Sequence, residues 1–296
     1  MKTAALLLLL AAPLFAAEEK GKTFDANGVT IWYEVRGGGA ATPLIIVNGG
    51  PGFDHGYTHL GDPVWDRLAK TRRVVFYDQR GNGRSSELKP GQSCTLADQI
   101  ADLDALRAQL SVEKLALLGH SWGGYLVMVY AARHPAHVEK LIIVDSAAPK
   151  LADTKFMFND FFPDTVEKQD RFTFADTLGD KSATAEGLKL YMTMLFYSPE
   201  KRDAALPRLA ASDYHKAVNE AIVADLGRFD LNPELPKYRF PTLVVTGRYD
   251  INVAPSVAWK IHKAIPGSQF SVFERSGHIP YYEEPEAFAK MMEGFL

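Results

Sequence analysis

Short apolar runs alternate along the chain with longer segments that have helical spacing. Apolar runs of roughly four to eight residues, bounded by Gly, Pro or polar residues, are typical of strands buried on both faces of a sheet. We expect strands at residues 29–35, 44–47, 74–77, 114–118, 141–145, 242–246 and 269–273.

A helix is predicted between two of these runs, over residues 95–110. Apolar side chains recur there every three or four residues, at Leu96, Ile100, Leu103, Leu106 and Leu110. Thr95 and Asp98 match a capping box at its start. Strands that alternate with helices predict an α/β fold, in which a mostly parallel twisted sheet is flanked by helices.

The alternation stops between residues 148 and 235. This segment is rich in Phe, Met and Tyr, and it has helical patches without a clear strand. Most connections between elements are only a few residues long, so we interpret the segment as an inserted helical cap, or lid. Ordinary crossover helices are the alternative. The predicted organisation is a core of residues 18–147 and 236–296 with a cap of residues 148–235.

The first residues have the pattern of an export signal. Lys2 precedes an apolar stretch over residues 4–12, and small residues follow up to Ala17. We predict a signal peptide over residues 1–17, a periplasmic or secreted protein, and no stable membrane insertion after its removal. A membrane anchor is the alternative, but the apolar stretch is shorter than the about 20 residues that span a bilayer.

Charge and composition exclude several partners. The chain has 36 acidic and 33 basic residues, so it lacks the basic excess typical of nucleic-acid binding. No cofactor motif is present, and the sequence does not determine the oligomeric state. His55 and His59 lie four residues apart beside two aspartates, which suggests a metal site. Because no HExxH or Cys/His framework accompanies them, we interpret them as part of an ordinary loop and expect no metal.

The candidate chemistry centres on Ser121, in the segment Gly-His-Ser-Trp-Gly-Gly at residues 119–124. This G-x-S-x-G pattern follows the apolar run 114–118 and precedes helix-compatible sequence at 125–133. Between a strand and a helix it is typical of a nucleophile elbow, whose sharp turn requires small flanking residues. We therefore expect the Ser121 hydroxyl at the end of the sheet, with the side chain of His120 directed away.

A serine hydroxyl needs a base that takes its proton and an acid that orients the base. On this kind of fold the partners follow later strands, in the order Ser, Asp, His. Asp250 lies four residues after the run 242–246, and His278 follows the run that ends at residue 273. Order and spacing therefore predict Ser121, Asp250 and His278 as a catalytic triad.

Acyl transfer also needs donors for the oxyanion that forms on the attacked carbonyl. One predicted donor is the backbone N–H of Trp122, directly after the nucleophile. The second is the N–H of Gly50, in the Asn-Gly-Gly-Pro-Gly loop at residues 48–52. No Lys-Ser/Thr follows this loop, which excludes a P-loop for phosphate.

Three segments together resemble the prolyl aminopeptidase (proline iminopeptidase) family of α/β-hydrolases. Residues 48–52 resemble the H-G-G-P-G loop of that family, residues 78–85 (DQRGNGRS) its D-Q-R-G-x-G-R-S segment, and residues 119–124 its elbow. The resemblance covers the core from about residue 23 to 147 and from residue 240 to the end. It implies an α/β-hydrolase fold and release of an N-terminal residue, often proline, from a short peptide.

The resemblance also implies carboxylates that hold the free α-amino group of the substrate. Glu220, in the cap, resembles one such acid. Some members have another acid directly after the triad aspartate, where this chain has Ile251. Glu283 is a candidate to take its place, and a helix-start or surface charge is its alternative role. Asn48 stands where the family's loop begins with histidine.

Two further functions fit the same pattern. A carboxylesterase or lactonase for small apolar acyl substrates would use the aromatic and Met residues of the cap as an acyl pocket, although these residues also suit the packing of a cap. They are Phe156, Phe161, Phe162, Met192, Met194 and Phe196. A non-catalytic binding protein is a third possibility, and the complete triad and glycine loop argue against it.

Overall fold

The computed structural model describes residues 21–296, and within them eight strands form one sheet. The strands are β1 (Lys22–Ala26), β2 (Val29–Arg36), β3 (Ala41–Val47), β4 (Arg72–Tyr77), β5 (Leu115–His120), β6 (Val138–Val144), β7 (Thr242–Gly247) and β8 (Gln269–Phe273). Their order across the sheet is β1-β2-β4-β3-β5-β6-β7-β8. Strand β2 is antiparallel to β1 and β4. The six strands β4, β3, β5, β6, β7 and β8 are parallel to one another.

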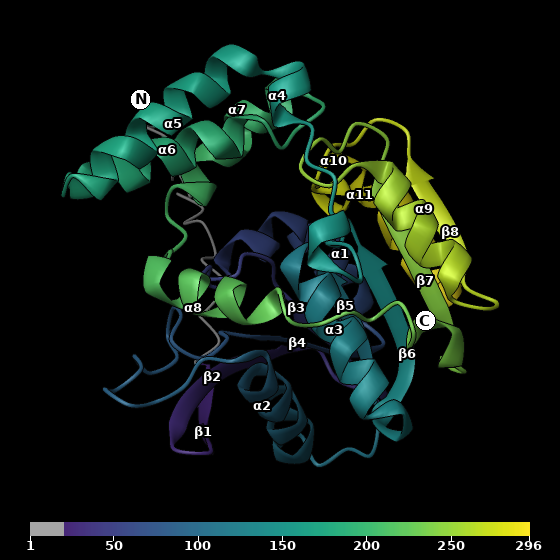
Figure 1. Ribbon diagram of the computed structural model, residues 1–296. Helices are drawn as coiled ribbons and strands as arrows, with labels where there is room; N and C mark the ends of the chain where they lie inside the picture. The colour runs from purple at the N-terminus through teal and green to yellow at the C-terminus, as the bar shows by residue number, and fades with distance from the viewer. Residues whose placement is uncertain (1–20) are drawn as a thin grey trace, which may run out of the picture.

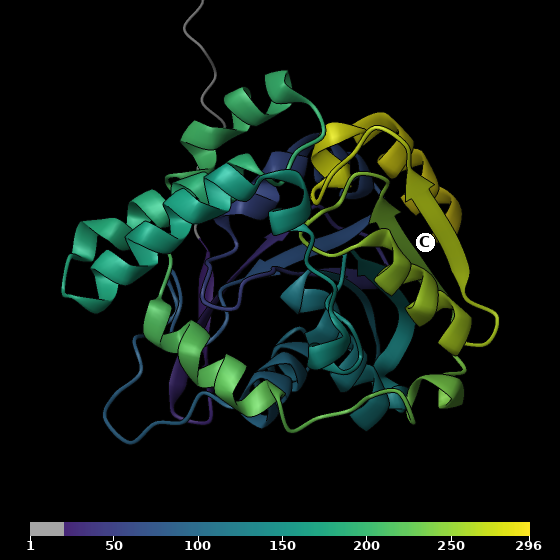
Figure 2. The ribbon, with the colours of Figure 1, turned by 45° about the horizontal axis from the view of Figure 1, so that its top comes forward.

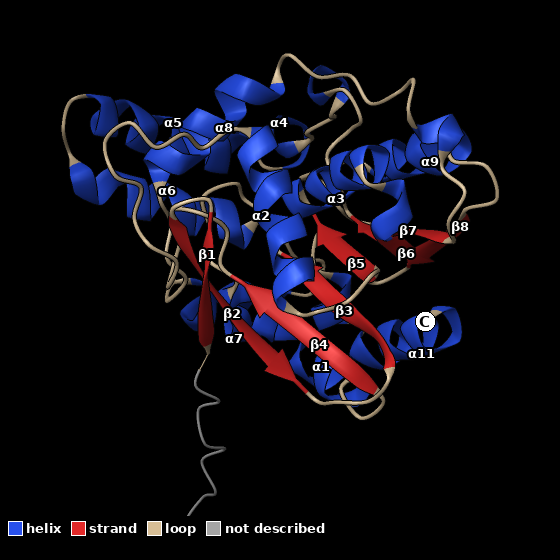
Figure 3. Cartoon of the chain, turned by 90° about the horizontal axis from the view of Figure 1, so that it is seen from below, coloured by secondary structure: helices blue, strands red, loops and turns tan. Residues whose placement is uncertain are grey.

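Helices cover both faces of this sheet (Figure 3). Helices α2 (Leu96–Gln109), α3 (Trp122–Arg133) and α9 (Pro255–Ala264) pack on one face, and α1 (Asp62–Leu68) and α11 (Pro285–Phe295) pack on the other. The short helix α10 (Pro280–Glu283) precedes α11, and 3-10 turns occur at η1 (Gly56–Gly61) and η2 (Pro135–His137). The prediction of an α/β fold with a mostly parallel, helix-flanked sheet is confirmed.

The apolar runs of the central strands fill both cores because successive side chains point to opposite faces. In β3, Ile45 and Val47 belong to the cluster under α2 and α3, whereas Leu44 and Ile46 belong to the cluster under α1 and α11. Alternate side chains of the other parallel strands are divided between the same two clusters. Burial on both sides explains why these strands are continuous apolar runs rather than alternating ones.

The segment between β6 and β7 is helical, as predicted. It contains η3 (Leu151–Asp153), α4 (Phe158–Phe161), α5 (Pro163–Thr177), α6 (Lys181–Thr193), α7 (Pro199–Leu209), α8 (Lys216–Leu226) and η4 (Leu235–Lys237). Figures 1 and 2 show α4–α7 gathered on one side of the sheet, with α8 beside them and close to α2. The domain boundaries at residues 147 and 236 stay a prediction.

The predicted signal peptide, residues 1–17, lies outside the described residues. Within residues 21–296, no helix combines the length and the apolar character needed to cross a membrane.

Candidate active site

Ser121 lies at a sharp turn between β5 and α3. Its backbone has φ 57° and ψ −121°, a left-handed conformation that is rare outside glycine. The flanking glycines are required by close packing, because a Cβ at Gly119 would lie 2.2 Å from the carbonyl oxygen of Gly123. A Cβ at Gly123 would lie 2.1 Å from the carbonyl oxygen of Val47, on the neighbouring strand. The local geometry is that of a nucleophile elbow.

The turn brings Ser121 to a pocket that His278 and Gly50 also line. The remaining lining is mostly apolar or aromatic and comes largely from the segment after the glycine loop and from α6, α7 and the link between them in the cap. It includes Phe53, Tyr57, Tyr191, Met192, Leu195 and Leu209. Ser121 therefore faces a concave, largely apolar site with a few polar groups, which is the usual character of a small-molecule pocket.

Asp250 and His278 come together behind this pocket. Asp250 follows β7 and His278 follows β8, and these two strands are neighbours in the sheet. Oδ2 of Asp250 lies 2.8 Å from Nδ1 of His278, and both side chains are buried. Oδ1 of Asp250 accepts hydrogen bonds from the N–H groups of Asn252 (2.9 Å) and Val253 (3.0 Å). The carboxylate is thus fixed by the turn after β7 and orients the imidazole of His278.

Burial sets the charge state of His278. Desolvation lowers the pKa of His278 to about 4, because the buried site disfavours an imidazolium ion. Burial also raises the pKa of Asp250, while hydrogen bonds from the N–H groups of Val253 and Asn252 oppose that rise. At neutral pH the imidazole is therefore neutral, with its Nδ1–H toward Asp250 and an unprotonated Nε2 that can act as a base.

The sequence did not indicate Asn252 as a site residue, but its side chain contacts this base. Nδ2 of Asn252 lies 2.9 Å from Nε2 of His278. Asn252 lies two residues after Asp250, in the same turn, so its side chain returns to the histidine that Asp250 orients. The spacing alone carries no signal for this contact, because the direction of the side chain depends on the fold of the turn.

The expectation for His120 was wrong. Its side chain is not directed away from the site but lines the pocket together with Ser121. Nε2 of His120 lies 2.7 Å from the carbonyl oxygen of His278 and Nδ1 lies 2.7 Å from the hydroxyl of Tyr57. Since a carbonyl oxygen only accepts, Nε2 carries the proton and Nδ1 accepts from Tyr57. His120 therefore links the elbow strand to the His278 loop.

The glycine loop is held beside the elbow by buried amides. Nδ2 of Asn48 donates to the carbonyl oxygens of Phe53 (2.9 Å) and Asp54 (3.2 Å), and so closes the loop on itself. Gln79 donates to the carbonyl oxygen of Asn48 (2.9 Å) and accepts from the indole N–H of Trp122 (2.9 Å). Asn48 thus serves as a scaffold for the loop that carries Gly50.

Of the two predicted oxyanion donors, Gly50 lines the Ser121 pocket, and Trp122 directly follows Ser121 in the chain. Gly50 has φ 128°, which an L-residue rarely adopts, and it lines the pocket with Ser121. Trp122 is the first residue of α3, and the first N–H groups of a helix have no partner within the helix. The positive end of the α3 dipole adds to the attraction for an oxyanion there.

Most of the segment 78–85 is buried, although Arg84 is exposed, and its Gln79 contacts the glycine loop. The carboxylate of Asp78 accepts from the N–H groups of His55 (2.9 Å) and Arg84 (2.8 Å) and from the His55 ring. Arg80 makes a bidentate pair with Asp102 of α2, with two N–O distances of 2.6 Å. These contacts are structural, and they fix the segment whose Gln79 contacts the glycine loop.

The two candidate amine-binding acids have different environments. Glu220, on α8, lines a second pocket that shares Gly50, Phe53 and Tyr191 with the Ser121 pocket. Its carboxylate is exposed and lies 3.9 Å from Nζ of Lys216. Lys216 also pairs with Asp176, which lines the same second pocket.

Glu283 does not line either of these pockets. Its carboxylate accepts hydrogen bonds from the backbone N–H groups of Tyr197 (3.0 Å), Ser198 (2.9 Å) and Gly277 (2.6 Å). It therefore joins the His278 loop to the start of α7 in the cap. We assign Glu283 a structural role, and it has no part in the amine site discussed below.

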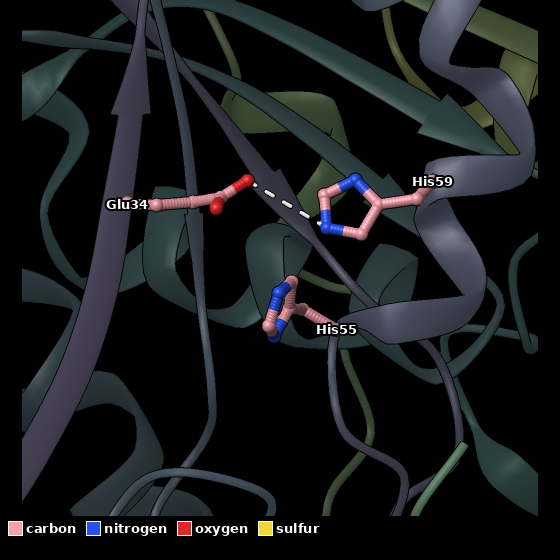
Figure 4. Close-up of side chains that lie close together, drawn as sticks. All are labelled: Glu34, His55 and His59. Atoms are coloured by element: carbon pink, nitrogen blue, oxygen red, sulfur yellow. Dashed lines mark ion pairs between the residues drawn. The ribbon is translucent and has the colours of Figure 1, made fainter. Parts of the chain in front are cut away.

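His55 and His59 form a polar cluster with Glu34 (Figure 4). Nε2 of His59 lies 3.6 Å from Oε1 of Glu34, and Nδ1 of His55 lies 2.7 Å from Asp78. The guanidinium of Arg36 lies 3.2 Å from Oε1 of Glu34 and 3.0 Å from Nδ1 of His59. Arg36 thus supplies the positive charge that a metal ion would bring, and we interpret the cluster as an ion-pair network between β2 and η1.

Comparisons with known proteins agree with this architecture. The profile of the alpha/beta hydrolase fold family matches residues 42–285. The proline iminopeptidase of Saccharolobus solfataricus is 29% identical over 286 residues, which are 91% of this chain and 89% of the relative. The proline iminopeptidase of Heyndrickxia coagulans is 29% identical over 276 residues, covering 89% and 93% of the two chains.

Solved structures show the same fold at lower identity. An alpha/beta fold family hydrolase from Bacillus anthracis superposes with a TM-score of 0.77 at 21% identity, covering 93% of this chain and 99% of that chain. The enol-lactonase of Burkholderia xenovorans gives 0.71 at 22% identity, with coverages of 93% and 99%. The chain therefore belongs to the alpha/beta hydrolase fold family and is a hydrolase that resembles the prolyl aminopeptidases.

Proposed function

We propose that this hydrolase is a serine aminopeptidase that releases N-terminal proline, or another small residue, from short peptides. The observation that carries the proposal is the junction of two pockets. The Ser121 pocket is small and apolar, and it shares Gly50, Phe53 and Tyr191 with a pocket that contains Glu220 and Asp176. A small apolar N-terminal residue fits the first, and its free amine fits the acidic groups of the second.

The charge balance of the second pocket favours an ammonium group. Asp176 and Glu220 are both acidic, and Lys216 is the one cation among the described residues that line this pocket. One negative charge is therefore left uncompensated in the pocket that adjoins the Ser121 pocket. A substrate ammonium would neutralise it, whereas an N-acetylated substrate would not, and this difference is the basis of selectivity for an unblocked N-terminus.

The proposed mechanism uses the groups around Ser121 in two half-reactions. The Ser121 hydroxyl attacks the carbonyl carbon of the first peptide bond, and its proton passes to Nε2 of His278. The N–H groups of Gly50 and Trp122 stabilise the oxyanion, and Asp250 stabilises the imidazolium. The proton on Nε2 is then donated to the leaving amine, the C–N bond breaks and an acyl-enzyme remains. Water, deprotonated by His278, releases the N-terminal residue and restores Ser121.

A carboxylesterase or lactonase is the second candidate, and the apolar lining of the Ser121 pocket favours it. Met192, Leu195 and Leu209 would contact an uncharged acyl group equally well. Of the cap residues predicted for such a pocket, Met192 lines it, while Phe156 and Phe161 are exposed.

The two candidates are separated by the substrates that the enzyme turns over. We would compare prolyl and alanyl arylamides, their N-acetylated forms, and short-chain p-nitrophenyl esters, using wild type and Ser121→Ala. An aminopeptidase hydrolyses the free-amine arylamides, loses this activity on N-acetylation, and loses it in Ser121→Ala. Turnover of the esters alone contradicts the aminopeptidase and identifies an esterase or lactonase. A Ser182→Ala variant, at an exposed position of α6, is the matched control.

We further propose that the protein is exported, on the basis of residues 1–17. Expression of the full chain in a Gram-negative host, followed by mass measurement of protein from the periplasmic fraction, tests this. The proposal predicts a species that lacks about 17 residues. Protein of full mass confined to the cytoplasm contradicts it.

A further inference from the structure

A second buried acid, Asp145, lies beside the Asp250–His278 pair. Asp145 follows β6, the strand next to β7, so the two acids come from equivalent ends of adjacent parallel strands. The N–H of Asp145 donates to the carbonyl oxygen of Val245 (3.0 Å), and the N–H of Gly247 donates to Oδ1 of Asp145 (3.0 Å). The backbone of Asp145 has φ 45°, an uncommon conformation for a residue other than glycine. The turns after β6 and β7 thus hold this carboxyl group in the interior.

The two carboxyl groups differ in how many donors reach them. Asp250 accepts from the N–H groups of Asn252 and Val253 and pairs with His278. Asp145 accepts from Gly247, and Oδ2 of Asp145 is buried with no hydrogen-bond donor among residues 21–296. A buried carboxylate oxygen without a donor is costly, whereas a protonated oxygen can itself donate. The group with fewer donors is therefore the one that holds a proton.

We propose that Asp145 and Asp250 form a proton-sharing carboxyl pair behind His278, in which Asp145 is protonated at neutral pH and donates to the carboxylate of Asp250. Asp145 is then a positioning residue, because it acts on His278 through Asp250. The inference rests on the proposed serine hydrolase function for its catalytic consequence, but not for the existence of the pair.

The electrostatics of the site agree with this geometry. Burial, and next the charge of Asp250, raise the pKa of Asp145 well above its usual range. Burial also raises the pKa of Asp250, and a proton donated by Asp145 is an interaction that opposes this rise. Two interacting carboxyl groups in a buried site cannot both be ionised without strong repulsion, so they share a proton.

The other ionisable groups that face the pair do not supply a compensating cation. They are His278, His120, Tyr191, Tyr281 and Glu283. His120 is neutral, since Nε2 donates to the His278 carbonyl oxygen and Nδ1 accepts from Tyr57. With both nitrogens of His120 in hydrogen bonds, the neighbouring His120, Asp145 and His278 are not arranged as ligands of a metal ion.

Replacing Asp145 separates a hydrogen-bond role from a merely structural one. Asp145→Ala removes the donor to the ionised form of Asp250, which raises the pKa of Asp250. Because catalysis requires ionised Asp250, the acidic limb of kcat/KM moves to higher pH, by about one pH unit. On the acidic limb, at pH values below the pKa of both proteins, this shift lowers kcat/KM about tenfold in the Ala variant. Asp145→Asn keeps an N–H donor of similar shape and is expected to restore most of this loss.

A direct test of the pair is infrared difference spectroscopy of the whole protein in D2O at neutral pH. We expect a C=O stretch from a protonated carboxyl group in wild type that is lost in Asp145→Asn. The band is kept in the control Asp153→Asn, which changes an exposed aspartate. In Asp250→Asn the negative charge that repels an ionised Asp145 is removed, so the pKa of Asp145 falls. The infrared band of protonated Asp145 therefore disappears at lower pH than in wild type.

Each outcome has a separate meaning. A wild-type spectrum without a band that depends on Asp145 overturns the proposal. It is also overturned if Asp145→Ala and Asp145→Asn have the same dependence of kcat/KM on pH. Circular dichroism and thermal unfolding establish that each variant is folded before it is compared. The infrared band needs no substrate, so a protein that hydrolyses nothing contradicts the proposed function while the carboxyl pair is still tested.

Discussion

Nε2 of His278 lies 2.9 Å from Nδ2 of Asn252. Since Nδ1–H of His278 faces Asp250, the Nε2 lone pair is the acceptor, and the Asn252 amide donates to it. This lone pair is also the one that must take the proton of Ser121 in the proposed mechanism. Asn252 therefore competes with the nucleophile for the base in the ligand-free protein.

Removal of this competitor is expected to make the enzyme faster. In Asn252→Ala, Nε2 of His278 has no competing donor and can accept from Ser121. The net free energy of one hydrogen bond corresponds to a gain of about two- to tenfold in kcat/KM. Steady-state kinetics with an ester or arylamide measure it. Asn232→Ala, at an exposed position, is the control. A tenfold or greater loss of activity would instead identify Asn252 as a group that positions His278 for catalysis.

Asn48 is expected to matter for catalysis through the loop that it holds. Asn48→Ala removes the donor to the carbonyl oxygens of Phe53 and Asp54, so the Gly50 N–H is no longer fixed. Loss of one oxyanion donor costs about 100- to 1000-fold in kcat, and a loosened donor is expected to cost at least about tenfold. KM should change less than kcat. Equal activity of Asn48→Ala and wild type would show that the loop keeps its shape without this amide.

Glu220 is expected to discriminate between charged and neutral substrates. Glu220→Gln removes the charge that attracts a substrate ammonium, so kcat/KM for a prolyl arylamide should fall about tenfold or more. Hydrolysis of a p-nitrophenyl ester should change little. Glu186→Gln, on the exposed surface of α6, controls for loss of a cap charge. A similar effect on both substrates would remove Glu220 from the amine site.

The Arg80–Asp102 pair is expected to contribute strongly to stability, because it joins the segment 78–85 to α2. Both side chains are buried, and Asp102→Asn leaves the Arg80 guanidinium without its bidentate partner. Breaking such a pair costs about 3–5 kcal/mol in the free energy of unfolding. The double variant Arg80→Met/Asp102→Leu should recover most of it, because no unpaired charge remains. Urea unfolding measures the free energy of unfolding of the single and the double variant. A value for Asp102→Asn within about 1 kcal/mol of wild type would contradict this prediction.

Local patterns account for the parts of this molecule that the sequence could predict. Strands buried on both faces are continuous apolar runs, and residues 95–110 carry both helical spacing and a cap, so the sheet and α2 (Leu96–Gln109) were predictable. The elbow was predictable because its turn needs glycine at fixed positions. Strand β1 (Lys22–Ala26) was missed, since its residues are mostly polar and it pairs at the edge of the sheet.

Side-chain partners that depend on the packing of distant segments could not be predicted. The contacts of Asn252 and His120 with His278 follow from the turn after β7 and from the approach of the His278 loop. Asp145 was predicted as the last residue of a strand, and only the neighbouring strand end brings it beside Asp250. Glu283 is near His278 in sequence, but its carboxylate turns toward the backbone at Tyr197.

In the proposed mechanism, Ser121 forms a covalent acyl-enzyme with substrates that carry a free α-amine. A diphenyl phosphonate analogue of proline, which traps an activated serine, tests it most directly when labelled peptides are mapped by mass spectrometry. We expect one adduct, on Ser121, that forms in wild type, is absent in Ser121→Ala, and forms much more slowly when the amine of the probe is acetylated. An adduct on another residue, or labelling that persists in Ser121→Ala, would contradict it.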